Sequence, residues 1–301
     1  MTLPATGMVM KVSAFPFLAS MKGETLITTD GTTLLGADDK AGVSEIMTAV
    51  ETVLEKGLPH GKLCIAFTPD EEIGEGASLF DIPGFGADFA YTVDGGDAGS
   101  VEYENFNAAG AKVIVHGLNI HPGSAKGKMV NSQLIAMEFQ SLLPVGQRPE
   151  LTEGYEGFFH LLGMKGEVER SELHYIIRDH DMEKFEEKKA VMAAAADFIN
   201  RKYGAGTLEL TVKDSYYNMK KCIEPCMYVV ERAKKAMAAA GMNPVEVPIR
   251  GGTDGARLSW ERDIPCPNLC TGGANFHGVH EFIPVPSMEK MVQVLVELVK
   301  A

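Results

Sequence analysis

The chain has 301 residues, enough to form one large domain or two smaller domains with a buried core. Its 28 Lys and Arg residues against 41 Asp and Glu residues give a formal net charge of −13, which argues against nucleic acid or an anionic membrane as a partner. An odd count of five cysteines, without a clear secretory signal, favours a reducing cytoplasm over a disulfide framework.

The first third of the sequence predicts strands alternating with a helix. Within residues 1–21, the stretch Met8–Phe17 is mildly apolar but interrupted by Lys11, and we leave residues 1–21 unassigned. Residues 25–37 predict two short β segments around a turn. Residues 40–55 have helical apolar spacing, whereas 63–67 and 89–93 have the composition of buried strands. Strand, helix and strand joined by short links predict an α/β layer with parallel strands.

The middle of the sequence has a different pattern, in which strands and helices follow the order β-α-β-β-α-β. This order is typical of a ferredoxin-like α+β domain and spans about residues 106–213. The predicted elements are a strand at 109–117, an amphipathic helix at 132–143, β structure at 166–178, a long helix at 182–203 and a strand at 208–212.

The last third returns to the α/β pattern, with a helix at 224–240, a strand at 244–248 and a terminal helix at 287–300. We therefore predict one α/β domain in two pieces, interrupted by an inserted domain. The predicted bounds are 22–105 and 214–301 for the α/β domain and 106–213 for the insertion, with 1–21 unassigned.

Acidic residues gather where three predicted strands or turns end. They are Asp38 and Asp39, the run Asp70-Glu71-Glu72, and Asp94. Carboxylates at the carboxyl ends of neighbouring strands repel one another unless a positive charge lies between them. One or two divalent metal ions are the usual solution. Taken singly, Asp38 and Asp39 could cap a helix, and the other acids could be solvated turns.

Three further segments carry candidate functional side chains. His277 and His280 lie in a glycine-rich loop beside Glu281, where imidazoles can project towards a metal. Arg250 lies among backbone groups suited to binding a carboxylate. His121 precedes a Pro-Gly pair, and its spacing alone predicts only a turn residue.

The sequence contains no His-Glu-x-x-His, no Gly-x-Ser-x-Gly and no phosphate loop ending in Gly-Lys-Ser/Thr. These absences argue against single-zinc proteases, serine hydrolases and nucleoside triphosphatases. The acidic clusters and histidines are therefore the main functional signal.

Nine runs between residues 25 and 255 carry a resemblance to a known family, and the likeness as a whole covers about residues 13–301. They are Thr25–Gly31, Leu34–Gly42, Phe67–Glu72, Tyr91–Gly96, Glu104–Ala109, Thr152–Gly157, His174–Asp179, Asp214–Met219 and Ile249–Gly255. In these runs the sequence resembles the peptidase T family of tripeptide aminopeptidases. That family belongs to the di-zinc exopeptidase superfamily of aminoacylases and carboxypeptidase G-type enzymes.

The resemblance implies a zinc-exopeptidase α/β domain with an inserted ferredoxin-like lid, which could also form a homodimer. It implies a cytoplasmic, zinc-dependent enzyme that releases the N-terminal residue of small tripeptide substrates. Asp38 would bridge two zinc ions, Glu72 would complete one site and His277 the other. Asp94 would be a terminal ligand of the ion not held by His277.

The resemblance also implies roles in the chemistry. Glu71 would be the general base for a metal-activated water. His121 would stabilise the oxyanion, reaching in from a second subunit if the chain dimerises. Arg250 would hold the main-chain carboxylate of the peptide, and Asn131 would also contact the substrate.

The family's His-x-Asp motif, which supplies another zinc ligand from an N-terminal segment, does not occur in these 301 residues. From the sequence we therefore expect an N-terminally truncated zinc domain with one incomplete zinc site and weak tripeptide hydrolysis. The alternatives are a non-catalytic remnant that binds peptides or dimerises, and a related deacylase of N-acyl amino acids.

Overall fold

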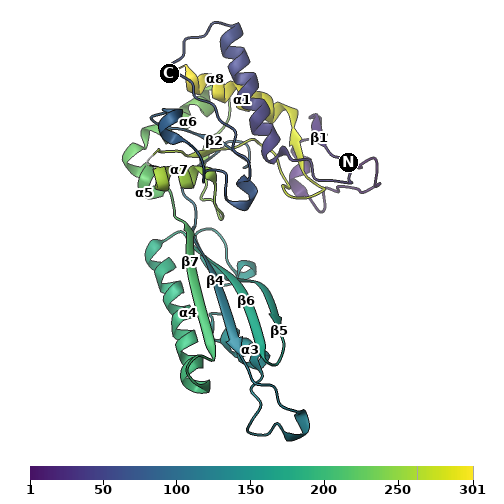
Figure 1. The fold of residues 1–301 in the computed structure, drawn as a ribbon. Helices are drawn as coiled ribbons and strands as arrows, with labels where there is room; N and C mark the ends of the chain where they lie inside the picture. The colour runs from purple at the N-terminus through teal and green to yellow at the C-terminus, as the bar shows by residue number, and fades with distance from the viewer. Residues whose placement is uncertain (263, 301) are drawn as a thin grey trace. The chain divides into compact units, whose positions relative to one another are not determined.

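The structure is a computed structural model that describes residues 1–262 and 264–300 (Figure 1). The chain divides into two compact units, each described here by itself. Unit 1 consists of Met1–Tyr103, Met219–Val247 and Thr253–Ala301, and unit 2 consists of Glu104–Asn218 and Pro248–Gly252. No helix in the described ranges combines the length and apolarity that crossing a bilayer requires.

Unit 2 has the predicted element order β-α-β-β-α-β. Its four antiparallel strands lie in the order β5-β6-β4-β7, and two helices follow the first and third of them along the chain. The elements are β4 (Asn107–His116), α3 (Ser132–Leu142), β5 (Phe158–Gly166), β6 (Arg170–Asp179), α4 (Met182–Tyr203) and β7 (Leu208–Tyr216).

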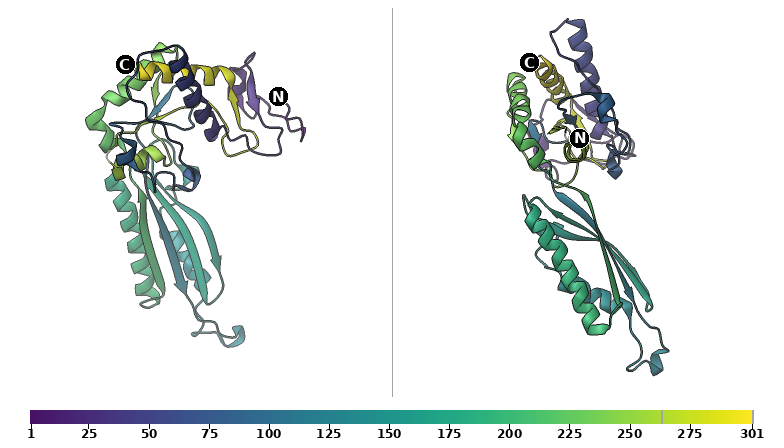
Figure 2. Two further views of the ribbon diagram at one scale, coloured as in Figure 1. Left: turned by 45° about the horizontal axis from the view of Figure 1, so that its top comes forward. Right: turned by 60° about the vertical axis from the view of Figure 1, so that its left-hand side comes forward.

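The core of unit 2 lies between this sheet and its helices. Alternate residues of β4, such as Val113 and Val115, are fully buried and belong to the same apolar cluster as Phe139 of α3 and Phe185 of α4. Because side chains alternate along a strand, this places both helices on one face of the sheet. Figure 2 shows α4 running along that face. At the start of α4, the Asp181 side chain accepts the backbone N–H of Lys184 at 2.9 Å.

Unit 1 is built from short strands and longer helices. Its mixed sheet has the order β2-β9-β3-β8, in which β2 runs parallel to β9 and β3 parallel to β8, while β3 and β9 are antiparallel. A separate antiparallel pair joins β1 and β10. The strands are β1 (Leu26–Thr28), β2 (Thr92–Val93), β3 (Ser100–Glu102), β8 (Val245–Glu246), β9 (Asn268–Leu269) and β10 (Phe282–Pro284).

The helices of unit 1 include the two predicted at either end of the α/β pattern. The α1 helix contacts α8, and α6 also packs against α8. The α-helices are α1 (Ala37–Glu55), α2 (Ile82–Phe85), α5 (Lys220–Ile223), α6 (Tyr228–Ala239), α7 (Asp254–Arg262) and α8 (Val285–Val299).

Two predicted β elements of unit 1 are wrong. Residues 63–67 form no strand, and their apolar side chains are substantially exposed, with Phe67 at 49%. A run of apolar residues becomes a buried strand only where a neighbouring strand pairs with it, and no such partner lies among the described residues. The predicted pair of β segments in 25–37 is also not formed, because β1 pairs with β10 instead.

Residues 1–21, which had no predicted role, pack onto the β1–β10 pair. Leu3 and Met10 are buried in one cluster with Phe282 of β10. The ring of Phe17 stacks on Phe282 with centroids 5.7 Å apart. The N-terminal stretch is therefore part of the apolar packing of unit 1.

Candidate metal centre

Asp38 lies at the point where the chain enters α1. Gly36, directly before the helix, has a left-handed φ of 71°, and Asp38 itself has the non-helical values φ −89° and ψ 100°. The peptide bond between Asp38 and Asp39 is cis. One turn later, a Cβ on Gly42 would lie only 2.1 Å from the carbonyl oxygen of Val93. Glycine at this position therefore allows α1 to approach the end of β2 closely.

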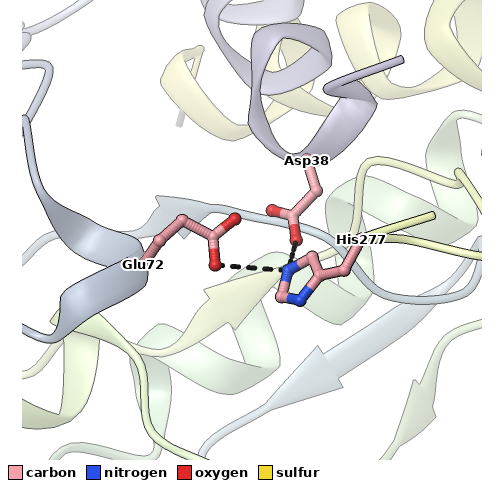
Figure 3. Close-up of side chains that lie close together, drawn as sticks. All are labelled: Asp38, Glu72 and His277. Carbon is pink, nitrogen blue, oxygen red and sulfur yellow. Dashed lines mark hydrogen bonds and ion pairs between the residues drawn. The ribbon is translucent and has the colours of Figure 1, made fainter. Parts of the chain in front are cut away.

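Asp38, Glu72 and His277 converge on one point of unit 1 (Figure 3). Nε2 of His277 lies 3.0 Å from Oδ2 of Asp38 and 3.2 Å from Oε2 of Glu72. Burial acts to lower the pKa of His277, but the carboxylates of Glu72 and Asp38 outweigh it and raise the pKa. The three side chains come from the start of α1, the turn after residues 63–67 and the loop before β10.

The family resemblance implies that Glu72 and His277 bind different metal ions, and this assignment stays a prediction. Their side chains face each other at 3.2 Å and belong to one group with Asp38. Their separation of about 200 positions along the chain leaves no local pattern that could show which ligands share an ion.

A second group of possible ligands contains Asp38, Asp39 and Asp94. Burial, followed by the charges of Asp94 and Asp38, raises the pKa of Asp39 to about 9. Burial, with Glu71 and Asp38 nearby, also raises the pKa of Asp94. Asp38 is thus common to both groups, which gives two adjacent positions around one shared carboxylate.

Glu71 lies beside these groups together with a carboxylate that the sequence reasoning missed. Burial, then the neighbouring charges of Asp254, Glu72 and Asp38, raise the pKa of Glu71 to about 7. Asp254 is 4% exposed, and its Oδ2 accepts the hydroxyl of Thr68 at 2.7 Å. The only sequence signal for Asp254 was its place after Arg-Gly-Gly-Thr, in the run considered for carboxylate binding.

The donor set fits a divalent metal. Its described residues offer carboxylate oxygens and one imidazole nitrogen, which are ligands that zinc accepts. Burial first, and then repulsion from neighbouring carboxylates, raises the pKa values of Asp39 and Asp94, so ionising these acids leaves negative charge that the surrounding protein does not neutralise. A cation between them would remove that excess charge.

His280 is not part of either group among the described residues. Its ring packs against Phe15 with centroids 5.2 Å apart, and its carbonyl oxygen accepts the side-chain amide of Asn275 at 3.0 Å. Of the two loop histidines considered from the sequence, the structure places only His277 with the carboxylates.

The other three predicted site residues lie in unit 2. Nδ1 of His121 accepts the backbone N–H of Gly123 at 3.1 Å. The Asn131 side chain accepts the backbone N–H of Gln133 at 3.0 Å and so caps α3. Their roles towards a substrate stay predictions.

Arg250 of unit 2 is held by the segment 152–156. Its guanidinium donates to the carbonyl oxygens of Gly154 at 2.6 Å and Glu156 at 2.9 Å, and to both the carbonyl and hydroxyl of Thr152. It also lies over the ring of Phe106 at 5.1 Å. In this structure Arg250 orders its own unit, and its binding of a substrate carboxylate stays a prediction.

Comparison with known sequences places this centre in a family. A sequence profile of the peptidase family M20/M25/M40 matches residues 30–301. The chain belongs to this family. The family consists of metal-dependent hydrolases, and the two ligand groups of unit 1 give this chain side chains that could hold metal.

Individual relatives confirm the resemblance predicted from the sequence runs. The chain is 57% identical over 293 residues to a protein from Alkaliphilus oremlandii named peptidase T, a match that covers 97% of this chain and 71% of that protein. It is 58% identical over 295 residues to a peptidase T from Clostridium perfringens, covering 98% and 72%.

Solved structures confirm the fold class. The aminopeptidase PepT from Bacillus cereus matches with a TM-score of 0.80 at 28% identity, covering 91% of this chain and 74% of that one. A tripeptidase from Staphylococcus aureus matches with a TM-score of 0.83 at 26% identity, covering 91% and 73%. The zinc-exopeptidase-type α/β fold with an inserted α+β domain is therefore shared with both.

Proposed function

We propose that the chain is a zinc-dependent aminopeptidase that removes the N-terminal residue of tripeptides. The observation that carries this proposal is the convergence of Asp38, Glu72 and His277 in a chain more than half identical to proteins named peptidase T. The printed descriptions of two similar structures, an aminopeptidase and a tripeptidase, support the same substrate class.

Each ligand group of unit 1 would hold one metal position. Asp38 would contribute to both, Glu72 and His277 to the first, and Asp94 to the second. When bound, divalent metal lowers the pKa of water at the site and polarises the carbonyl of the peptide bond.

The remaining roles are those that the family resemblance implies. Glu71 adjoins Glu72 in sequence, and burial together with the charges of Asp254 and Glu72 raises its pKa to about 7. We propose it as the general base that takes a proton from the attacking water and passes it to the leaving amine. We propose His121 as the oxyanion donor, Arg250 and Asn131 as substrate contacts, and unit 2 as lid and dimerisation domain. A cytoplasmic location likewise stays a prediction.

A metal-dependent activity assay tests the proposal. We expect the zinc-loaded protein to cleave a tripeptide with a free amino terminus, and a chelator to abolish the cleavage. Asp38→Asn should lower cleavage and zinc affinity at least about 100-fold, because it weakens a ligand shared by both groups. Asp88→Asn, at an exposed position of the same unit, is the matched control.

The substrate panel separates the alternatives. Cleavage of N-acetylated amino acids in preference to the free tripeptide would replace the proposal with a deacylase. Peptide binding without cleavage, unaffected by chelator, would identify a non-catalytic binding protein instead.

A further inference from the structure

The loop that carries His277 is closed on itself. At its base, Ala274 and Phe282 exchange both backbone hydrogen bonds, at 2.9 and 3.1 Å. Within it, the Asn275 side chain donates to the carbonyl oxygen of His280, and His277 has a left-handed φ of 62°. The loop therefore presents the His277 imidazole from a defined backbone, and the position of the whole loop decides where Nε2 lies.

Glu281, the residue before β10, connects this loop to the start of α1. Its carboxylate accepts the backbone N–H of Gly36 at 2.7 Å through Oε2 and that of Asp38 at 3.1 Å through Oε1. Glu281 is only 1% exposed. Both oxygens of one buried carboxylate thus bind the segment that carries Asp38, although 243 residues separate Glu281 from Asp38.

These two bonds give acceptors to backbone N–H groups at the start of α1. The N-cap residue Gly36 has no side chain. The Asp39 carboxylate accepts the backbone N–H of Gly42 at 3.2 Å, whereas the N–H groups of Gly36 and Asp38 are bound by Glu281. A carboxylate at a helix N-terminus also interacts favourably with the helix dipole. Glu281 therefore adds a second carboxylate, from the loop that carries His277, to the local one of Asp39.

The next residue, Phe282, fixes the loop from its other side. Phe282 is fully buried, stacks with Phe17 and lies in one cluster with Leu3 and Met10. Because successive strand residues point to opposite faces, Glu281 can reach α1 while Phe282 packs against the N-terminal stretch. The loop is thereby held between two segments of unit 1.

We propose that Glu281 is a positioning residue that sets the distance between the Asp38 and His277 side chains for a divalent metal. This inference rests on the proposed metal centre, to which Glu281 would contribute no ligand atom. Its carboxylate holds the backbone of Gly36 and Asp38 in place. Because Glu281 also lies in the same short segment as His277, four residues later, it links the positions of these two side chains. Groups that orient metal ligands typically change metal affinity about 10–100-fold when they are altered.

The test is a Co²⁺ titration of Glu281→Gln, followed by the visible absorption bands of the ion. Glutamine keeps the shape but replaces one acceptor oxygen with an NH₂ group, which cannot accept either backbone N–H. We expect Co²⁺ affinity to fall about 10–100-fold and the absorption bands to shift. Glu289→Gln, exposed on α8, should leave both unchanged.

Repeating the Glu281→Gln change in a His277→Ala protein distinguishes a positioning role of Glu281 from a general loss of structure. In a His277→Ala protein, Glu281→Gln should weaken Co²⁺ binding less than about threefold, because the distance it controls no longer matters. Glu281→Gln should shift the urea unfolding midpoint equally in the protein with His277 and in the His277→Ala protein. Equal losses of Co²⁺ affinity in the two backgrounds would overturn the proposal. If Glu281→Gln does not fold, Glu281→Asp gives the same comparison with the charge retained.

The outcomes for the metal centre and for Glu281 differ. If the unaltered chain binds no Co²⁺, the proposed metal centre fails and the role of Glu281 fails with it. If the unaltered chain binds Co²⁺ and Glu281→Gln binds it equally well, only the role of Glu281 fails.

Discussion

Unit 2 and unit 1 are stabilised in different ways. Unit 2 has one continuous apolar core, and its buried Lys188 and Asp179 form an ion pair at 2.7 Å. Unit 1 has strands of two or three residues, and both carboxylate oxygens of its buried Glu45 lack a hydrogen-bond partner among the described residues. The two units therefore differ in their buried charges. In unit 2 the charges of Lys188 and Asp179 neutralise each other, whereas in unit 1 the stability should depend on whether Glu45 is ionised.

The largest expected effect comes from the core of unit 2. Phe139→Ala removes a fully buried ring and should lower the free energy of unfolding by about 3–5 kcal/mol, through lost burial and the cavity left behind. Urea unfolding followed by circular dichroism measures this loss. A loss below about 1 kcal/mol would break the comparison, because it would mean that unit 2 is not held by its core.

Removing one partner of the Lys188–Asp179 ion pair tests whether the two buried charges of unit 2 neutralise each other. Lys188→Met would leave Asp179 buried without its partner and should destabilise the protein by roughly 3–5 kcal/mol. Lys184→Met, at an exposed position of the same helix, should change stability by less than about 0.5 kcal/mol. Similar urea midpoints for the two variants would contradict the compensating role of Lys188.

Glu45 of unit 1 should behave in the opposite way. Burial raises its pKa from 4.5 to about 8. The contribution of Glu45 to the free energy of unfolding is therefore fully present below pH 4.5, where the acid is protonated, and is lost as the pH rises through 8. Glu45→Gln, which resembles the protonated acid, should therefore stabilise the protein on the order of 2 kcal/mol at pH 8.5 and little at pH 4.5.

Thermal unfolding of the Glu45→Gln variant and its parent across this pH range measures the effect. Glu51→Gln, exposed on the same helix, is the control that should show no such pH dependence. A stabilisation that does not grow between pH 4.5 and pH 8.5 would refute the assigned burial cost.

The smallest effect is expected at Phe67, in the segment predicted as a buried strand. Because its side chain is 49% exposed, Phe67→Ala should cost less than about 1 kcal/mol, well below the Phe139→Ala value. The same urea experiment compares the two. A cost equal to that of Phe139→Ala would show that residues 63–67 are buried in solution and that unit 1 has a larger core.

The fold of unit 2 could be predicted from sequence because its signals are local. Apolar residues recur at helical spacing through 182–203, Asp181 caps the start, and Gly204 follows the end. The predicted bounds of this helix agree with those of α4. In unit 1, the apolar content of 63–67 was equally local, but strand formation depends on a pairing partner elsewhere, which composition does not record.

The candidate site shows the same limit. Asp38, Glu72 and His277 were predicted from acidic patterns and a family resemblance, and the structure brings them together. Asp254 and Glu281 were not predicted as parts of the site, because their contacts span 186 and 243 residues. Their sequence signal was limited to an acidic residue after glycines and a glutamate four positions after His277.

The packing of the N-terminal stretch has a practical consequence for preparing this protein. Leu3 and Met10 lie against Phe282, which closes the loop carrying His277. A polyhistidine purification tag fused before Met1 would therefore bring additional imidazoles close to the segment that supports the metal ligand. Such a tag would compete for added Co²⁺ or zinc, so the stoichiometry of the centre is measured cleanly only after the tag has been cleaved off.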